Sequence, residues 1–131
     1  TNVNSVTTLT GVTDILDSTS GTLEFSNRGL KVNDTFLIRL DVNVSVNTIP
    51  SQLFIDLDFY DSVNGTGNIQ FSQSTELMSI NDTAGVFKND SVLMSFFLGD
   101  SIKEGSCKIS LRGSTAFDVE VIGYNIQIHR K

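Results

Sequence analysis

The residue types that carry most nucleophilic and metal chemistry are scarce in this chain. Cys107 is the single cysteine, and His129, two residues from the end, is the single histidine. A serine or cysteine triad therefore has His129 as its sole candidate base, and one Cys with one His is too few ligands for a closed zinc site. Cys107 begins an alternating run with Ile109 and Leu111, which is typical of a small buried hydrophobe. We expect no catalytic residue, no metal ion and no cofactor, and we expect that the chain is not an enzyme.

The densest group of carboxylates is formed by Asp56, Asp58 and Asp61. Calcium prefers several oxygen ligands that converge from one loop. Leu57 and Phe59 alternate with the aspartates, however, and this alternation predicts a strand with Asp56 and Asp58 as solvated charges on one outward face. Paired carboxylates also hydrolyse glycosides, so a small hydrolase of that kind stays an alternative, although the sequence singles out no pair.

Sugar recognition is a further chemistry that an all-β chain can perform. Carbohydrate-binding sandwiches often stack sugar rings on exposed aromatic side chains, but the chain has no tryptophan, and Tyr60 and Tyr124 are its two tyrosines. Loops that carry Asn, Asp and backbone groups also bind sugars. A carbohydrate-binding β-sandwich module of a larger secreted or surface protein is therefore the alternative function.

The clearest pattern in the chain is strict alternation of apolar residues. They occupy every second position from Phe36 to Val46, which predicts a long strand with one buried face and one wet face. No stretch has the spacing of a sustained amphipathic helix, so the chain is predicted to be all-β. The predicted strands span residues 6–10, 22–26, 35–46, 52–60, 69–72, 76–80, 91–99, 106–112 and 117–129.

About eight strands at regular spacing favour a two-sheet antiparallel jelly-roll sandwich. Asn64 and Gly65 form the strongest turn signal between strands. In the last strand the apolar positions change from odd to even numbers, which predicts a β-bulge at Ile122 and Gly123. Residues 1–20 are polar, with apolar residues at every third position, and we interpret them as a lead-in next to a stem. Residues 21–131 are predicted to form a single sandwich domain.

The formal net charge of −6 argues against two classes of partner. Nucleic acids and anionic membranes both attract basic surfaces, so neither is expected to bind here. No stretch reaches the length and apolarity of a transmembrane helix. Because the chain begins at Thr1, we expect it to be a piece of a longer polypeptide.

Several large apolar residues occupy strand positions whose side chains are predicted to point away from the core. A contiguous exposed group of this kind is rare on monomers, so we predict self-association, with cover by loops or isolated exposure as the alternatives. Leu93 and Phe97 lie four residues apart on one predicted strand and share a face. The predicted oligomer interface comprises Leu37, Phe54, Tyr60, Leu93, Phe97 and Ile122.

A family resemblance rests on residues 87–99 and on the run Phe117-Asp-Val-Glu-Val-Ile-Gly-Tyr-Asn-Ile-Gln-Ile-His129, where strand, bulge and terminal strand follow one another. With its acidic composition and polar lead-in, the chain resembles the trimeric jelly-roll knobs of the tumour-necrosis-factor/C1q type, in particular those that cap tail fibres and tail needles of tailed bacteriophages. The resemblance implies a homotrimer at the distal end of a virion tail structure. It also implies attachment to a host cell-surface component, such as a glycan, or penetration of the host envelope.

Overall fold

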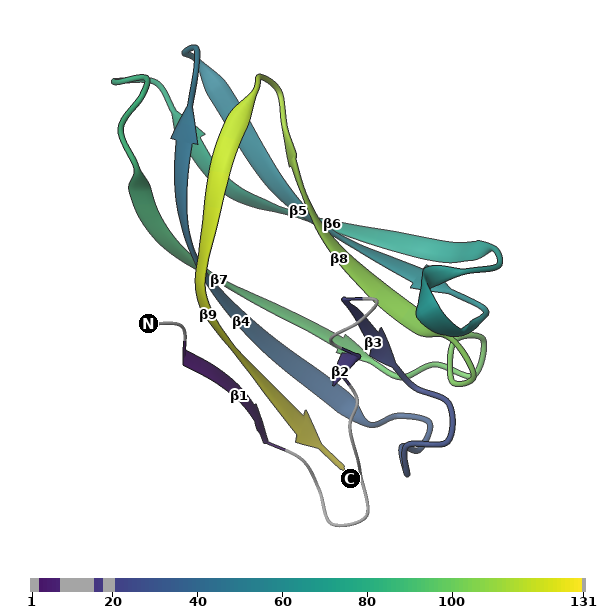
Figure 1. The fold of residues 1–131 in the computed structure, drawn as a ribbon. Helices are drawn as coiled ribbons and strands as arrows, with labels where there is room; N and C mark the ends of the chain where they lie inside the picture. Colours follow the sequence, from purple (N-terminus) through teal and green to yellow (C-terminus); the bar gives the residue numbers. More distant parts are fainter. Residues whose placement is uncertain (1–2, 8–15, 18–20, 131) are drawn as a thin grey trace.

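The computed structural model describes residues 3–7, 16–17 and 21–130, and the side chains of 21–130. It confirms the predicted all-β class, with two sheets packed face to face (Figure 1). The first sheet has the strand order β1-β9-β4-β7, and the second has the order β2-β3-β8-β5-β6. The strands are β1 (Val3–Thr7), β2 (Leu16–Asp17), β3 (Thr22–Glu24), β4 (Thr35–Val46), β5 (Ser51–Tyr60), β6 (Ile69–Ile80), β7 (Lys88–Phe97), β8 (Ser106–Gly113) and β9 (Phe117–His129).

The strand pairs are nested along the chain. β5 pairs with β6, β4 with β7, and β3 with β8, each antiparallel, so the chain is one long hairpin rolled across the two sheets. Such wiring is that of a jelly roll. β9 joins the first sheet antiparallel to β4, and β1 lies parallel to β9 on its other side.

The lead-in agrees with the sequence only in part. The strand predicted at residues 6–10 overlaps β1, which begins earlier and ends at Thr7. Residues 8–10, and with them most of the positions of the threefold apolar spacing, lie outside the described residues. The short strand β2 was not predicted, because two residues carry no alternation to detect.

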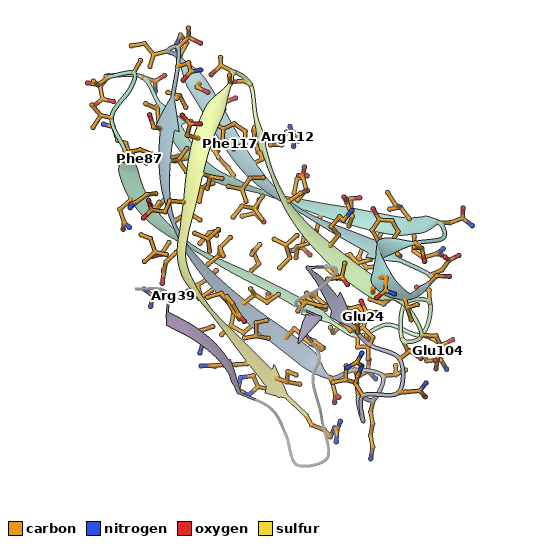
Figure 2. The ribbon with its side chains drawn as sticks, viewed as in Figure 1. Glu24, Arg39, Phe87, Glu104, Arg112 and Phe117 are labelled. Carbon is orange, nitrogen blue, oxygen red and sulfur yellow. The ribbon has the colours of Figure 1, made fainter. Side chains whose placement is uncertain are left out.

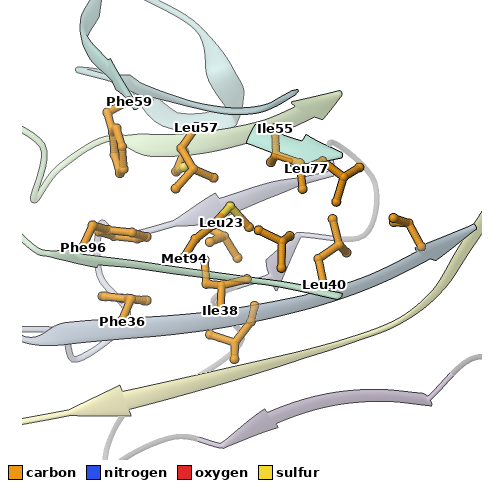
Figure 3. Packing of buried hydrophobic residues seen from close by; sticks show 14 of the residues in the cluster. Leu23, Phe36, Ile38, Leu40, Ile55, Leu57, Phe59, Leu77, Met94 and Phe96 are labelled. Carbon is orange, nitrogen blue, oxygen red and sulfur yellow. The ribbon is translucent and has the colours of Figure 1, made fainter. Parts of the chain in front are cut away.

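The core fills the space between the inner faces of the sheets. Alternate residues of β4 and β5 are buried there, as the sequence pattern predicts. Phe96 of β7 stacks on Phe36 of β4 with ring centroids 4.7 Å apart, and its ring meets Phe59 of β5 edge on at 4.8 Å (Figure 3). Aromatic pairs of these geometries add to the free energy gained by burial, and the second one joins the two sheets.

The bulge predicted in β9 is confirmed by the strand register. Asp41 of β4 pairs with Gly123, whereas its neighbour Val42 pairs with Val121. Ile122 is therefore the extra residue that has no partner position on β4. The extra residue changes which side of the strand each later residue faces, so the apolar positions on both sides of the bulge can face the core.

The two weak strands predicted at 69–72 and 76–80 form one continuous strand, β6. Its register with β5 shifts twice, and these shifts leave Gln70 and Leu77 as extra residues. The bulge at Leu77 brings this side chain into the core, where it is buried. The prediction divided β6 because Gln73, Ser74 and Thr75, which lie between the two predicted strands, are all polar and show no apolar alternation.

The loop between β5 and β6 is held by side chains from other strands. Asn64 and Gly65, in the short 3-10 helix η1 (Val63–Gly65), both have positive φ values, as expected for the predicted turn. The buried carboxylate of Glu24 in β3 accepts a hydrogen bond from the Asn64 N–H at 3.0 Å (Figure 2). The Ser106 hydroxyl accepts one from the Gly65 N–H at 2.8 Å. The loop is thereby tied to β3 and β8.

The end of β9 is tied to the loop that precedes β4. The Arg130 guanidinium donates to both oxygens of Asp34, with Nε···Oδ1 at 2.8 Å and Nη2···Oδ2 at 2.7 Å. Asp34 is 1% exposed, and it also accepts a hydrogen bond from the Lys31 N–H. The hydrogen bond from Arg130 holds the pKa of the Asp34 carboxyl below its usual value.

We predict that Arg130→Met lowers the Tm by several degrees at pH 7, because it leaves the buried Asp34 carboxylate without its cation. The folded-state pKa of Asp34 is depressed, so the ion pair stabilises the fold above the unfolded pKa of about 3.9 and loses this effect as the pH falls through the folded value. Thermal unfolding at pH 7 and at pH 3 should show the difference between variant and native protein shrinking in acid. An equal difference at both pH values would contradict the role given to Asp34.

We also predict that Gly105→Ala destabilises the protein by about 1–3 kcal/mol. An added Cβ at Gly105 would lie 1.8 Å from the Tyr60 carbonyl oxygen, so the backbone must shift. Gly99→Ala is the matched control, because nothing lies within 4 Å of a Cβ at that position. Urea denaturation should give a lower midpoint of unfolding for Gly105→Ala than for Gly99→Ala. Equal midpoints would contradict the prediction, because they would show that the backbone near Gly105 accommodates a Cβ without loss of stability.

Candidate self-association surface

Three apolar side chains lie together on the outer face of the first sheet. Leu93 and Phe97 of β7 are each 63% exposed, and both point away from the core. Leu37 of β4 pairs with Ser95, the residue midway between them, so it is a diagonal neighbour of both. These three residues, Leu37, Leu93 and Phe97, are called the apolar face below.

Polar groups border the apolar face. A surface hollow of about 490 Å³ is lined by Leu37 and Leu93 together with Arg39, Asp41 and other side chains of β4 and β9. Arg39 Nε lies 3.0 Å from Asp41 Oδ1, and the Ser91 hydroxyl also donates to Asp41. The hydrogen bond from Ser91, followed by that from Arg39, lowers the pKa of Asp41. An apolar centre with a polar, charged border is the usual anatomy of a protein interface.

The apolar surface continues over the edge of the sheet onto β6. Phe71 stacks on Phe59 with ring centroids 4.4 Å apart, yet it stays 44% exposed because β6 is the edge strand of the second sheet. Phe71 and Phe97 line one hollow of about 370 Å³. The Gln73 amide donates to the Ser95 carbonyl at 3.3 Å, which joins β6 to β7 across this hollow. Sequence reasoning missed Phe71, because its parity is that of a core residue and only the strand order shows that β6 is an edge strand.

The structure divides the six residues predicted for the interface between two faces. Phe54 and Tyr60 of β5 lie on the outer face of the second sheet, on the side of the sandwich opposite the apolar face. Ile122 is the half-buried extra residue of the β9 bulge. The expectation of one contiguous group therefore holds for Leu37, Leu93 and Phe97, and it is wrong for Phe54 and Tyr60. The outward-facing residues of β4 and β7 lie on one side of the sandwich, and the outward-facing residues of β5 lie on the opposite side.

Phe54 has a partner within its own subunit. The Arg112 guanidinium of β8 lies over its ring, with the guanidinium carbon 4.6 Å from the ring centroid. Such a cation–π contact covers one side of the ring. Arg39 of β4 lies on the first outer face and Arg112 on the second, and both are labelled in Figure 2. We therefore leave Phe54 out of the candidate surface.

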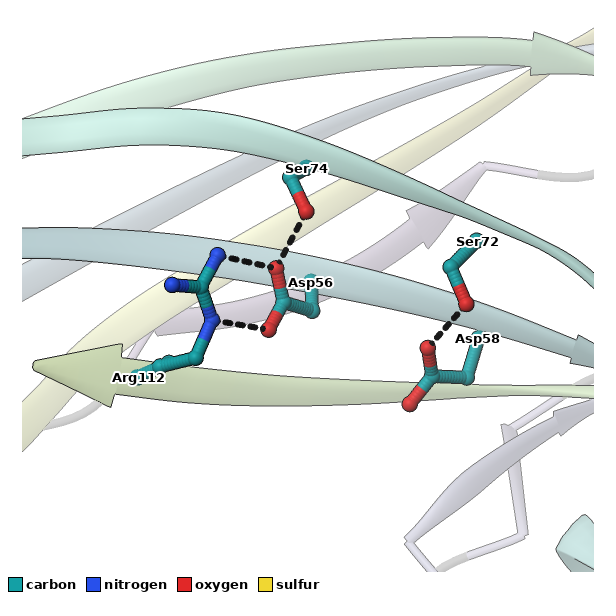
Figure 4. Close-up of polar contacts among 5 residues, drawn as sticks. All are labelled: Asp56, Asp58, Ser72, Ser74 and Arg112. Atoms are coloured by element: carbon teal, nitrogen blue, oxygen red, sulfur yellow. Dashed lines mark hydrogen bonds and ion pairs between the residues drawn. The ribbon is translucent and has the colours of Figure 1, made fainter.

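The aspartates of β5 lie on this second outer face, as the alternation predicted, but they form a hydrogen-bonded row in place of the expected solvated charges, and the Asp56 side chain is only 17% exposed. Arg112 donates to both oxygens of Asp56 at 3.0 and 3.4 Å, and the Ser74 hydroxyl donates to Asp56 at 2.6 Å (Figure 4). Ser72 donates to Asp58 at 2.6 Å. The hydrogen bonds from Arg112 and then Ser74 lower the pKa of Asp56. Both carboxylates thus have hydrogen-bond partners from neighbouring strands.

The remaining candidates for chemistry lie apart from this surface. Cys107 is fully buried in the core, and burial raises the pKa of its thiol far above the usual value, as expected for a packing residue. His129 is exposed at the end of β9. Within residues 21–130, no group of three or more His, Cys, Asp or Glu side chains converges where it would hold a metal ion. No helix in the described part of the chain is long and apolar enough to span a membrane.

No protein-family profile matches the chain, and no curated protein or solved structure is significantly similar to it. A function can therefore be proposed only from the geometry of the apolar face and from the resemblance of the sequence pattern to trimeric jelly-roll knobs.

We predict that Phe97→Asp disrupts self-association, because it would place a carboxylate in the centre of a buried contact. The matched control is Tyr60→Asp, which adds the same charge on the opposite outer face. Sedimentation velocity at micromolar concentration should show Phe97→Asp as a smaller species and leave the control unchanged. If both variants keep the native sedimentation coefficient, Phe97 has no place in the interface.

Proposed function

We propose that this chain is a non-enzymatic knob domain that works as a homotrimer and buries the apolar face between subunits. The observation that supports this most is the exposure of Leu93 and Phe97 on the same outer face of β7, with Leu37 of β4 diagonal to both. Fully burying each such side chain is worth roughly 1.5–3 kcal/mol. A symmetric assembly repeats this gain in every subunit, which offsets part of the free energy lost when the subunits associate.

The polar border supports a contact between copies of the same chain. Arg39 and Asp41 place opposite charges beside the apolar face, so a second copy can offer a complementary charge to each. The choice of three copies follows from the resemblance to trimeric jelly-roll knobs. The nested strand pairs of the two sheets agree with that type of fold.

The biological role that we propose is host-cell attachment, or penetration of the host envelope, at the distal end of a bacteriophage tail fibre or tail needle. This role rests on the same resemblance. The partner would be a component of the host cell surface, such as a glycan. The domain would then act by binding.

We predict that the purified chain has a molar mass in light scattering of three times its 14.3 kDa chain mass at micromolar concentration. A stable mass at higher dilution is expected if the apolar face is fully buried. A monomer of 14.3 kDa would contradict the proposal. A monomer that binds defined sugars on a glycan array would instead support the carbohydrate-binding module.

A further inference from the structure

An apolar pocket of about 200 Å³ opens between the two sheets on the side of β8 and β9. One wall is formed by Ile109 and Leu111 of β8, and the other by Val121 and Ile126 of β9. Ile38 of β4 closes its inner end. Figure 1 shows why a space exists here, because β8 and β9 diverge from their connecting loop and continue in different sheets.

The walls of the pocket are held in place by the core. Leu23, Ile38 and Ile126 contribute to the lining and are each no more than 2% exposed, so their positions are set by packing on their other sides. The pocket is therefore present before any ligand arrives. A preformed site loses little conformational entropy when it binds.

The lining selects against water and against charge. Tyr124 is the one lining residue whose side chain carries a polar group, and no lining residue is charged. A bound water needs two to four polar partners, which this lining does not offer, so water in the pocket is readily displaced by an apolar group. A comparable apolar cavity of about 150 Å³ binds benzene. The present pocket is somewhat larger, so it has room for a ring of that size or for a short alkyl group.

The pocket has an opening for such a ligand. β3 pairs with β8 only from Ser106 to Lys108, and β1 pairs with β9 only from Gly123 to Gln127. Residues 109–113 of β8 pair with β5 and residues 117–120 of β9 pair with β4, but among the described residues no strand lies along the other edge of either segment. Val121 is 41% exposed at this opening, and Ile109 and Leu111 are half-buried. The mouth of the pocket is thus apolar as well.

We propose that this pocket is a binding site for a small uncharged apolar molecule, either an aromatic ring or a short alkyl chain. Transfer of such a ligand from water is favourable because it removes the apolar surface of both ligand and pocket from solvent. The site lies between the sheets, whereas the apolar face lies on the outer side of the first sheet. The proposal is therefore independent of self-association.

The test is a titration of the native protein with benzene, followed by NMR of methyl-labelled isoleucine and leucine residues. We expect saturable chemical-shift changes at Ile38, Leu111 and Ile126. The methyl groups of Leu37 and Leu93 report nonspecific binding to the apolar face and should change little. Absence of shifts at the three pocket residues up to the solubility limit of benzene would overturn the proposal.

A pair of variants tests whether the pocket itself is the site. Leu111→Phe fills the space and should weaken benzene binding by about tenfold or more. Ile69→Phe adds an aromatic ring at a position of β6 that is 52% exposed and does not line the pocket, so it should bind benzene as the native protein does. If Leu111→Phe does not fold, Ile109→Phe on the same wall replaces it. Unchanged affinity in the filled variant would overturn the proposal, and light scattering on the same samples reports the oligomeric state separately.

Discussion

The packing of Phe96 against Phe36 and Phe59 is the contact on which the rest of the structure depends. It joins β7 and β4 of the first sheet to β5 of the second, with ring centroids less than 5 Å apart. Successive residues of a strand face opposite sides, so burial of Phe96 requires that Phe97 points outward. A slip of one residue in register would exchange the two rings and move every core side chain of β7 to the surface. The core thus dictates the composition of the outer faces.

These outer faces differ in chemistry because different strands supply them. The first sheet presents Leu37, Leu93 and Phe97 beside the Arg39 and Asp41 pair, and self-association is the use that we propose for it. The second sheet presents a row of serine, aspartate and arginine side chains that bond to one another across β6, β5 and β8. Between the sheets, the divergence of β8 and β9 leaves the pocket to which we assign an apolar ligand.

The strands show how far pattern reasoning reaches. The bounds of β4 and β9 agree with the sequence pattern, and so does the bulge at Ile122, because one parity change lies between two clear alternating runs. β6 was divided into two strands, because residues 73–75 between the predicted strands are all polar and show no apolar alternation. Phe71 extends the apolar surface around the sheet edge, and it was missed because its parity is that of a core residue. Alternation is a local signal, and it does not show which strand lies at the edge of a sheet.

The sequence by itself determined that this chain is a β-sandwich and which residues of its long strands face inward, because side-chain direction alternates with a period of two in any strand. It also showed that Leu93 and Phe97 share a face. Only the tertiary structure decided that Phe54 and Tyr60 lie on the opposite side, and that Ile109 and Ile126 line one pocket. The physical reason is that strand pairing relies on backbone N–H and C=O groups, which nearly all residue types carry alike. Sheet membership therefore depends on the packing of the whole core and leaves no mark on any single strand.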